Sequence, residues 1–310
     1  MNKKLVVKPS GIGGQAVLEG VMMKNRDRYA VAVRKPDGEI EVEKGHCQSL
    51  RDKYFVCDLP IIRGVVTFVE SLVLGMKSLT DSSKYYEDEE EENRQQMDDA
   101  AKEWHEKIET TFTVILSIVL AVGIFMVLPF FISELLKSII KSAKVLAVIE
   151  GIIRIILFIG YVFAISFVED IKRVFMYHGA EHKTINCVEH MLPLTVENVR
   201  KQSREHKRCG TSFIFIVLFI SIIFFIFIRV DNMWLKVLYR IVLVPVIAGV
   251  SYEFIRLAGK SENELVNILS KPGMMLQKLT TKEPDDSMIE VAIASVEAVF
   301  DWKKFQEDSK

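Results

Sequence analysis

Four long apolar segments constrain the fold of this chain more than any other feature. They cover residues 110–133, 145–168, 212–230 and 235–257, and each is close to the length of helix that crosses the hydrocarbon core of a bilayer. A buried core helix is the alternative for any one segment. Four of them, in a chain of which half the residues are hydrophobic, favour a membrane protein. The sequence therefore predicts an α-helical polytopic membrane protein with four transmembrane helices.

The distribution of Lys and Arg predicts the orientation of these helices. The connection between the second and third segments, residues 169–211, carries eight basic residues, whereas the other two connections offer three and two. Basic loops stay on the cytoplasmic side. We therefore expect a multi-pass protein of the cell inner (plasma) membrane with both termini cytoplasmic. The four cysteines would face a reducing compartment, as free thiols or metal ligands rather than disulfides.

The rest of the chain divides into cytoplasmic segments. Residues 1–58 are predicted to form a small β-containing module, because two alternating stretches, 29–33 and 39–43, flank the turn sequence Pro36-Asp37-Gly38. Residues 54–57 are a candidate further strand. An amphipathic helix and an acidic linker are expected over 59–109, the four-span domain with its loop 169–211 over 110–257, and a helical tail over 258–310 that Asp285 or Asp286 could cap.

A His-x-x-Glu-His motif follows the second apolar segment. His178 and His182 are four residues apart, so on a helix they face the same way and can hold one metal ion, for which we expect zinc. Glu181 lies beside them and could take a proton from a water on the metal, as the catalytic base of an inverted zinc-hydrolase motif. Glu189, seven residues after His182, returns to the same face and is a further candidate ligand. His190 is rotated away.

Two more candidate ligands stand just before the third apolar segment. His206 and Cys209 return to the same membrane surface as the motif, because a loop between two spans brings its ends together. Four protein ligands would make a closed structural zinc site, whereas three would leave a position for water and chemistry. The alternative without a metal is a polar network of these side chains. Glu253, close to the end of the last segment, is another possible ligand or a partner of Arg256.

Charged residues also occur within the apolar segments. Glu150 and Arg154 are four residues apart and can pair, and Arg240 lies at a similar depth. We interpret them as a structural ion pair rather than as a conduction path. The formal net charge of −1 gives no reason to expect a nucleic-acid partner. The glycines of residues 11–14 match neither the Rossmann nor the P-loop spacing, which argues against a nucleotide cofactor.

Four separated blocks of this sequence together resemble one family. Gly13-Gly14-Gln15-Ala16-Val17-Leu18-Glu19-Gly20-Val21-Met22-Met23, His178-Gly179-Ala180-Glu181-His182, Arg208-Cys209-Gly210-Thr211 and Glu283-Pro284-Asp285-Asp286-Ser287-Met288-Ile289-Glu290-Val291-Ala292 are similar to the YqhQ-like family of bacterial membrane proteins. Lys207 departs from the proline that the family pattern has between His and Arg. The resemblance implies a membrane protein that depends on a metal at the same His and Glu residues, but no particular reaction.

Two functions compete at this stage. The first is a membrane scaffold or accessory protein whose His/Cys/Glu site shapes a loop that docks a partner. The second is a membrane-bound zinc hydrolase that acts on a peptide or a lipid head group at the cytoplasmic face. The large cytoplasmic share of the chain favours the scaffold. Membrane lipids and a membrane-protein or cytoplasmic protein are the expected partners, and a homo-oligomer is compatible with the pattern. A transporter ranks third, because few charges lie within the spans.

Overall fold

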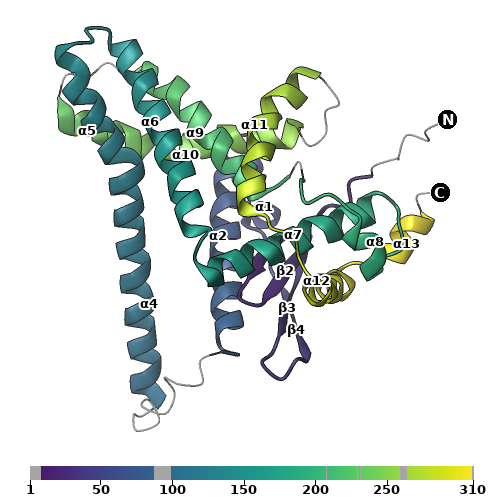
Figure 1. The fold of residues 1–310 in the computed structure, drawn as a ribbon. Helices are drawn as coiled ribbons and strands as arrows, with labels where there is room; N and C mark the ends of the chain where they lie inside the picture. Colours follow the sequence, from purple (N-terminus) through teal and green to yellow (C-terminus); the bar gives the residue numbers. More distant parts are fainter. Residues whose placement is uncertain are drawn as a thin grey trace. The chain divides into compact units, whose positions relative to one another are not determined.

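The computed structural model describes residues 8–86, 99–206, 208–228, 230, 232–258 and 264–308, with the side chains of 99–103, 105–107, 264–267 and 269 excepted. Four short strands come first and are followed by helices throughout (Figure 1). The strands are β1 (Ile12–Val17), β2 (Gly20–Asn25), β3 (Arg28–Arg34) and β4 (Ile40–His46).

The strands form one antiparallel sheet in the order β1-β2-β3-β4. The predicted hairpin is confirmed as β3 and β4, in which Arg34 pairs with Ile40 across the turn. Gly38 has a φ of 89°, a left-handed conformation that glycine adopts without steric cost. The predicted strand at residues 54–57 is wrong. Residues Phe55–Asp58 form a 3-10 turn after the short helix α1 (Leu50–Lys53), because Ser49 caps α1 and turns the chain.

The remaining helices are numbered as in Figure 1. They are α2 (Ile62–Ser83), α4 (Asp99–Val122), α5 (Leu128–Leu135), α6 (Ala143–Ile165), α7 (Glu169–Glu189), α8 (Val196–Arg200), α9 (Gly210–Ile226), α10 (Met233–Ala258), α11 (Glu264–Thr280), α12 (Asp286–Val299) and α13 (Trp302–Glu307). A π-helical turn (Gly123–Val127) joins α4 to α5, and a 3-10 turn (Leu136–Ser138) follows α5. Asp285 caps α12 by accepting from the Met288 N–H, as predicted. Residues 87–98 of the predicted acidic linker lie outside the described residues.

Both faces of the sheet are covered. Ile12, Val21 and Met23 belong to a core shared with α7 and α12, in which Tyr177 and Ile289 are also buried. The side chains that alternate with them, such as Val17 and Met22, point the other way and pack with Leu74 of α2. This alternation follows from the two-residue period of a strand. The sheet is therefore a central layer, with α7 held against β1.

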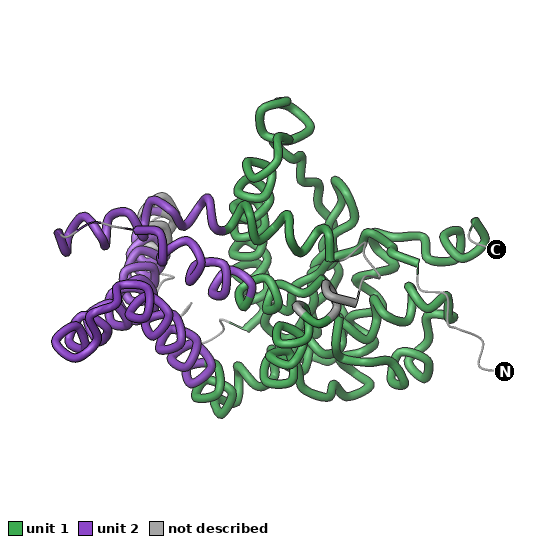
Figure 2. Tube along the Cα trace, turned by 90° about the horizontal axis from the view of Figure 1, so that it is seen from above, with its two compact units in different colours: residues 1–86, 162–215, 248–310 green, residues 87–161, 216–247 purple. Residues whose placement is uncertain are grey.

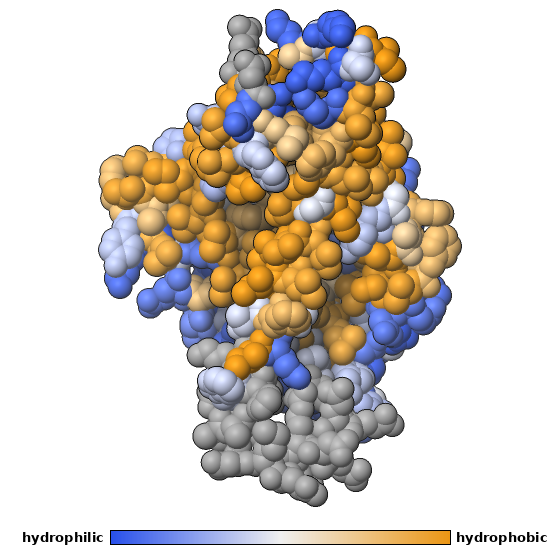
Figure 3. All heavy atoms as spheres, turned by 90° about the vertical axis from the view of Figure 1, so that its left-hand side faces the viewer, coloured by the Kyte–Doolittle hydropathy of each residue, from blue (hydrophilic) through white to orange (hydrophobic). Residues whose placement is uncertain are grey.

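Among the described residues, three helical segments are long and apolar enough to cross a membrane: Ile108–Ser138, Ala143–Ile165 and Met233–Ala258. The remaining predicted span corresponds to α9, a shorter apolar helix of 17 residues. Most of the apolar side chains on these helices are exposed, for example Phe112, Ile118 and Val119 on α4. Figure 3 shows a broad apolar surface on that face of the molecule. Such a surface is typical of a segment that contacts lipid or another protein.

The chain forms two compact units, coloured separately in Figure 2. The first contains residues 1–86, 162–215 and 248–310, and the second contains residues 87–161 and 216–247. Each unit is assembled from segments that are distant in the sequence. The sheet, α7 and α12 all belong to the first unit, which holds the whole candidate metal site.

Candidate metal site

The motif lies in the middle of α7, where small residues let other segments approach the helix closely. Gly179 faces the backbone of Lys282, whose carbonyl oxygen would be 2.1 Å from a Cβ at that position. The Lys282 N–H donates to the carbonyl of Phe175, which ties the segment before α12 to α7. On the sheet side, Ala180 is fully buried. The Gly-Ala pair between the two histidines therefore buries the motif between the sheet and the C-terminal segment.

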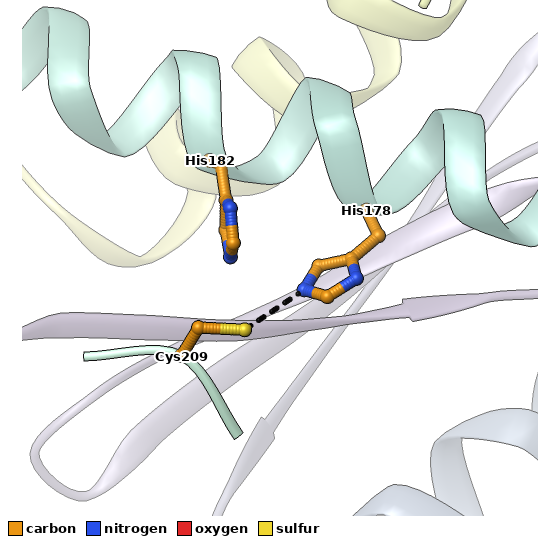
Figure 4. A group of neighbouring side chains, drawn as sticks. All are labelled: His178, His182 and Cys209. Atoms are coloured by element: carbon orange, nitrogen blue, oxygen red, sulfur yellow. Dashed lines mark hydrogen bonds between the residues drawn. The ribbon is translucent and has the colours of Figure 1, made fainter. Parts of the chain in front are cut away.

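Three of the predicted ligands come together at this point. The ligand atoms of His178, His182 and Cys209 all lie within 4.8 Å of one another, and Nε2 of His178 is 3.3 Å from Sγ of Cys209. Figure 4 shows the two rings projecting from α7 toward the cysteine. Zinc binds nitrogen at about 2.0–2.1 Å and sulfur at about 2.3 Å, so tetrahedral ligand atoms are about 3.5 Å apart. The group could therefore bind a metal ion, with the His178–Cys209 distance already close to this spacing.

Both histidines are oriented by backbone carbonyls. Nδ1 of His178 lies 2.9 Å from the carbonyl oxygen of Thr280, and Nδ1 of His182 contacts the carbonyl oxygen of Arg204. A carbonyl can only accept, so each Nδ1 carries the hydrogen, and Nε2 is the ring atom that could bind a metal. A hydrogen bond from the ring nitrogen that does not bind the metal is the usual way in which proteins orient a metal-binding imidazole. Burial lowers the pKa of His182, so its ring is neutral and able to ligate.

Glu181 is buried beside this group without a full set of partners. Its Oε2 atom is 3.9 Å from Nε2 of His178 and has no hydrogen-bond partner among the described residues. Burial raises the pKa of Glu181 to about 7, although His178 and the backbone N–H of Gly14 oppose the rise. Gly14 comes so close that a Cβ there would lie 2.8 Å from Cγ of Glu181. A buried carboxylate oxygen without a partner is costly and indicates a missing ligand or water.

A small cavity adjoins Glu181. It has a volume of about 100 Å³, and its walls include Gly13, Gly14, His178, Glu181, Arg208 and Cys209. A water molecule takes about 30 Å³ in the liquid, so the cavity has room for a few waters beside the unpartnered oxygen. A wider cleft of about 400 Å³ also has Gly13 and Gly14 in its wall, together with Lys24 of β2, Arg26 of the turn after β2 and residues of α2.

His206 and Glu189 lie near this group but contact each other instead. Nε2 of His206 is 3.5 Å from Oε2 of Glu189. The other carboxylate oxygen of Glu189, Oε1, accepts from Arg208 and from the N–H and hydroxyl of Ser10. Burial alone would raise the pKa of Glu189, but His206 and Arg208 hold it at about 2. Glu189 thus joins the N-terminal segment, the end of α7 and the loop that carries Cys209.

Two residues that the sequence did not single out hold the same loop. Gln277 of α11 is fully buried, accepts from the N–H of His206 at 2.9 Å and donates to its carbonyl at 2.8 Å. The amide of Asn186 donates to the carbonyls of Ser203 and Glu205. Neither residue has a sequence signal, because a single Gln or Asn in a helix is ordinary. Their role depends on a loop that is distant in sequence.

Other candidate residues have partners outside the site. His190 contacts Gln202 at 2.8 Å, consistent with its predicted rotation away from the motif. Lys183 pairs with Glu283 rather than with Glu181. Glu253 forms a bidentate ion pair with Arg63 of α2, at 2.6 and 2.5 Å.

The fold thus defines a class of protein: one with several candidate membrane-crossing helices and a His₂Cys group, of which His182 and Cys209 are buried, beside a small β-sheet. The chain belongs to the family described as "Protein of unknown function (DUF1385)", whose model matches residues 59–302. It is similar to "Uncharacterized protein YqhQ" of Bacillus subtilis (strain 168), with 37% identity over 290 residues that cover 93% of this chain and 91% of the relative. No solved structure matches it.

Proposed function

We propose that this chain is a membrane-bound, zinc-dependent hydrolase. The zinc ligands in this proposal are His178, His182 and Cys209, and Glu181 is the general base. The observation that carries the proposal is the combination of three ligand atoms within 4.8 Å of one another with a neighbouring buried carboxylate oxygen that has no hydrogen-bond partner in the part of the chain that the structure describes. Catalytic zinc sites have three protein ligands and one open position, whereas closed structural sites have four.

The division of roles follows from the contacts of each side chain. Zinc in such a site supplies a Lewis acid and lowers the pKa of water to about 7. Glu181 is 3.9 Å from the ligating nitrogen of His178, close enough to receive the proton of an attacking water. The water oxygen forms the new bond to the acyl or phosphoryl centre. Glu181 then returns the proton to the leaving group, so hydrolysis needs no further reactant.

Two features support access for a substrate. The small cavity beside Glu181 and the wider cleft share Gly13 and Gly14 in their walls. These residues lie in β1, one of the two edge strands of the sheet, and glycine there leaves the backbone uncovered by side chains. Lys24 and Arg26 in the cleft would favour a substrate with a negative group. We place the site at the cytoplasmic face of the inner membrane, where a peptide or a lipid head group can reach it.

Burial favours a second candidate function, a non-catalytic scaffold. Glu181, His182 and Cys209 are 5%, 1% and 6% exposed, which suits a metal or a polar network that only fastens the loop. In this function His206 would move to complete a closed shell, and the loop would dock a membrane-protein or cytoplasmic partner. The two functions differ in the role they give to Glu181.

The test compares Glu181→Gln with the parent and with Glu169→Gln, a matched change at an exposed position on the same helix. Each full-length protein is reconstituted with bacterial lipid extract and a peptide pool, and products are measured by mass spectrometry alongside bound zinc. We expect zinc-dependent products from the parent and the control, and about a 100- to 10,000-fold lower rate from Glu181→Gln with zinc retained. A zinc-loaded Glu181→Gln protein with the parental rate would refute the assignment of the base. The scaffold function would be favoured if no variant formed products and if removal of zinc loosened the loop.

A further inference from the structure

The second unit contains a buried cluster of one carboxylate and two guanidinium groups. Glu150 and Arg154 of α6 and Arg240 of α10 are 1%, 3% and 6% exposed. Arg240 donates to both oxygens of Glu150, at 3.0 and 2.6 Å, and Arg154 donates to one of them at 2.8 Å. The sequence predicts the Glu150–Arg154 pair from its spacing, and Arg240 joins it from another helix.

The cluster has an excess of positive charge. One carboxylate is shared by two guanidinium groups, and arginine does not lose its proton in proteins. The other partners of these groups are neutral: Arg154 donates to the carbonyl of Phe125 and to Ser221, and Arg240 to the carbonyl of Lys236. The described residues place no second carboxylate within hydrogen-bonding distance of either arginine. A buried cation without a counter-ion is costly, and most costly in a membrane.

Arg240 faces a cavity with further basic residues around it. The cavity has a volume of about 100 Å³, and its wall includes Glu150, Arg240, Lys236 and Lys141. It also includes Lys137 and Glu134, which pair with each other at 2.6 Å, and the other oxygen of Glu134 lies 3.8 Å from Nζ of Lys236. Each guanidinium has five N–H donors and can serve more acceptors than the three that Arg240 contacts. The cavity therefore combines free donors, positive charge and room for a small oxyanion.

We propose that this cavity binds an anionic phosphate group. A phosphate supplies the missing negative charge to the cluster and accepts from several N–H donors at once, which is the geometry that guanidinium groups match. Arg240 would hold the phosphate from inside the cavity, and Lys141 and Lys236 from its mouth. The source is either the head group of an anionic lipid or free inorganic phosphate. Basic pockets between membrane helices bind lipid head groups in this way.

The test uses the purified full-length protein in detergent and measures the rise in melting temperature with added ligand. The probes are phosphatidylglycerol, phosphatidylcholine, and inorganic phosphate against chloride at equal ionic strength. Phosphatidylcholine carries a phosphodiester too, but its cationic choline cancels the charge and would meet the basic residues of the cavity wall. We therefore expect stabilisation by phosphatidylglycerol and not by phosphatidylcholine or chloride, which identifies an anionic lipid. If inorganic phosphate raises the melting temperature as much as phosphatidylglycerol does, the free ion is sufficient to occupy the cavity. A response to phosphatidylcholine equal to that for phosphatidylglycerol, without a phosphate effect, overturns the proposal.

Variants at the mouth of the cavity make the test specific. Arg240→Gln removes a partner of the buried Glu150 and is expected to destabilise the unit, so it is not the main variant. Lys141→Gln with Lys236→Gln leaves the cluster intact and should lower the apparent affinity for the stabilising probe about tenfold. Lys172→Gln, an exposed lysine of α7 in the first unit, is the matched control and should leave it unchanged. Unchanged affinity in the double variant would show that the probe binds elsewhere and would overturn the proposal.

Discussion

Arg208 donates a hydrogen bond to the buried carboxylate of Glu189, and Cys209 follows Arg208 directly in the chain. Glu189 lies at the end of the helix that carries His178 and His182. This ion pair therefore links the helix with two ligands to the loop with the third. It gives Glu189 a positioning role in the proposed site, without direct contact with the metal.

The first prediction is that Glu189→Gln weakens zinc binding. Glutamine keeps the size of the side chain but removes the charge that holds Arg208 and His206. Loss of such an outer partner typically costs about 10- to 100-fold in metal affinity. Competition with a fluorescent chelator measures the affinity, and Glu169→Gln serves as the control. Parental affinity in Glu189→Gln would mean that the loop is held without this pair.

The same pair predicts a dependence of stability on pH in metal-free protein. The folded pKa of Glu189 is lowered to about 2 from an ordinary value of 4.5. A lowered pKa means that the stabilisation is fully present above about pH 4.5 and is lost as the pH falls toward 2. The melting temperatures of the parent and Glu189→Gln should therefore differ most near neutral pH and converge in acid. A constant difference from pH 7 to pH 3 would contradict this assignment.

The ligand set can be checked one histidine at a time. His178→Ala and His182→Ala should lose zinc, because each removes one of three ligand atoms. His190→Ala should retain zinc, since His190 contacts Gln202. His206→Ala should also retain about one zinc per chain, because His206 faces Glu189 rather than the ligand group. Elemental analysis of the purified variants measures this, and loss of zinc from His206→Ala would favour a closed four-ligand shell.

Local patterns account for the parts of the structure that the sequence predicts well. The β3–β4 hairpin follows from Pro36-Asp37-Gly38, the cap of α12 from Asp285, and the shared face of His178 and His182 from helical spacing. The pairing of Glu150 with Arg154 has the same origin. Each of these depends on residues a few positions apart, where geometry is determined by backbone periodicity.

The parts that sequence analysis missed depend on contacts between distant residues. Strands β1 and β2 together contain three glycines and two methionines, which have little preference for strands. Packing against α7 and α12 stabilises both strands. Gln277 acquires its role from a loop 71 residues earlier. The sequence predicts that His206 and Cys209 lie at the same surface. Only the fold shows that His206 contacts Glu189, whereas Cys209 contacts His178.

Gly179 provides a stability prediction within the motif. Gly179→Ala would place a Cβ 2.1 Å from the carbonyl oxygen of Lys282, and a backbone atom cannot move aside cheaply. We expect a loss of about 1–3 kcal/mol, the usual cost of overpacking. Gly160→Ala in α6 is the control, since nothing lies within 4 Å of its Cβ position. Thermal unfolding in detergent measures both, and equal melting temperatures would mean that the segment before α12 is not held against α7.

The last prediction concerns how many helices cross the membrane. The sheet, α7 and α12 pack into one unit and must lie on one side of the bilayer. The chain leaves this unit at residue 86 and returns at 162, and leaves it again at 215 and returns at 248. Each excursion must therefore cross the membrane an even number of times. The first contains two of the candidate spans, and the second contains α10, so we predict that α9 crosses together with α10 despite its 17 residues.

Cysteine labelling of intact cells with a membrane-impermeant reagent tests this argument. Ser142→Cys, between α5 and α6, and Asn232→Cys, before α10, should be labelled from outside. Asp37→Cys, in the β3–β4 turn, should be labelled only after permeabilisation, because the basic connection of residues 169–211 predicts a cytoplasmic first unit. Labelling of Ser142→Cys without Asn232→Cys would mean that α9 and α10 do not cross. Labelling of Asp37→Cys alone from outside would reverse the orientation. Labelling of both Asp37→Cys and Ser142→Cys would mean that the helical segment Ile108–Ser138 between them does not cross the membrane, which would contradict the four-span arrangement.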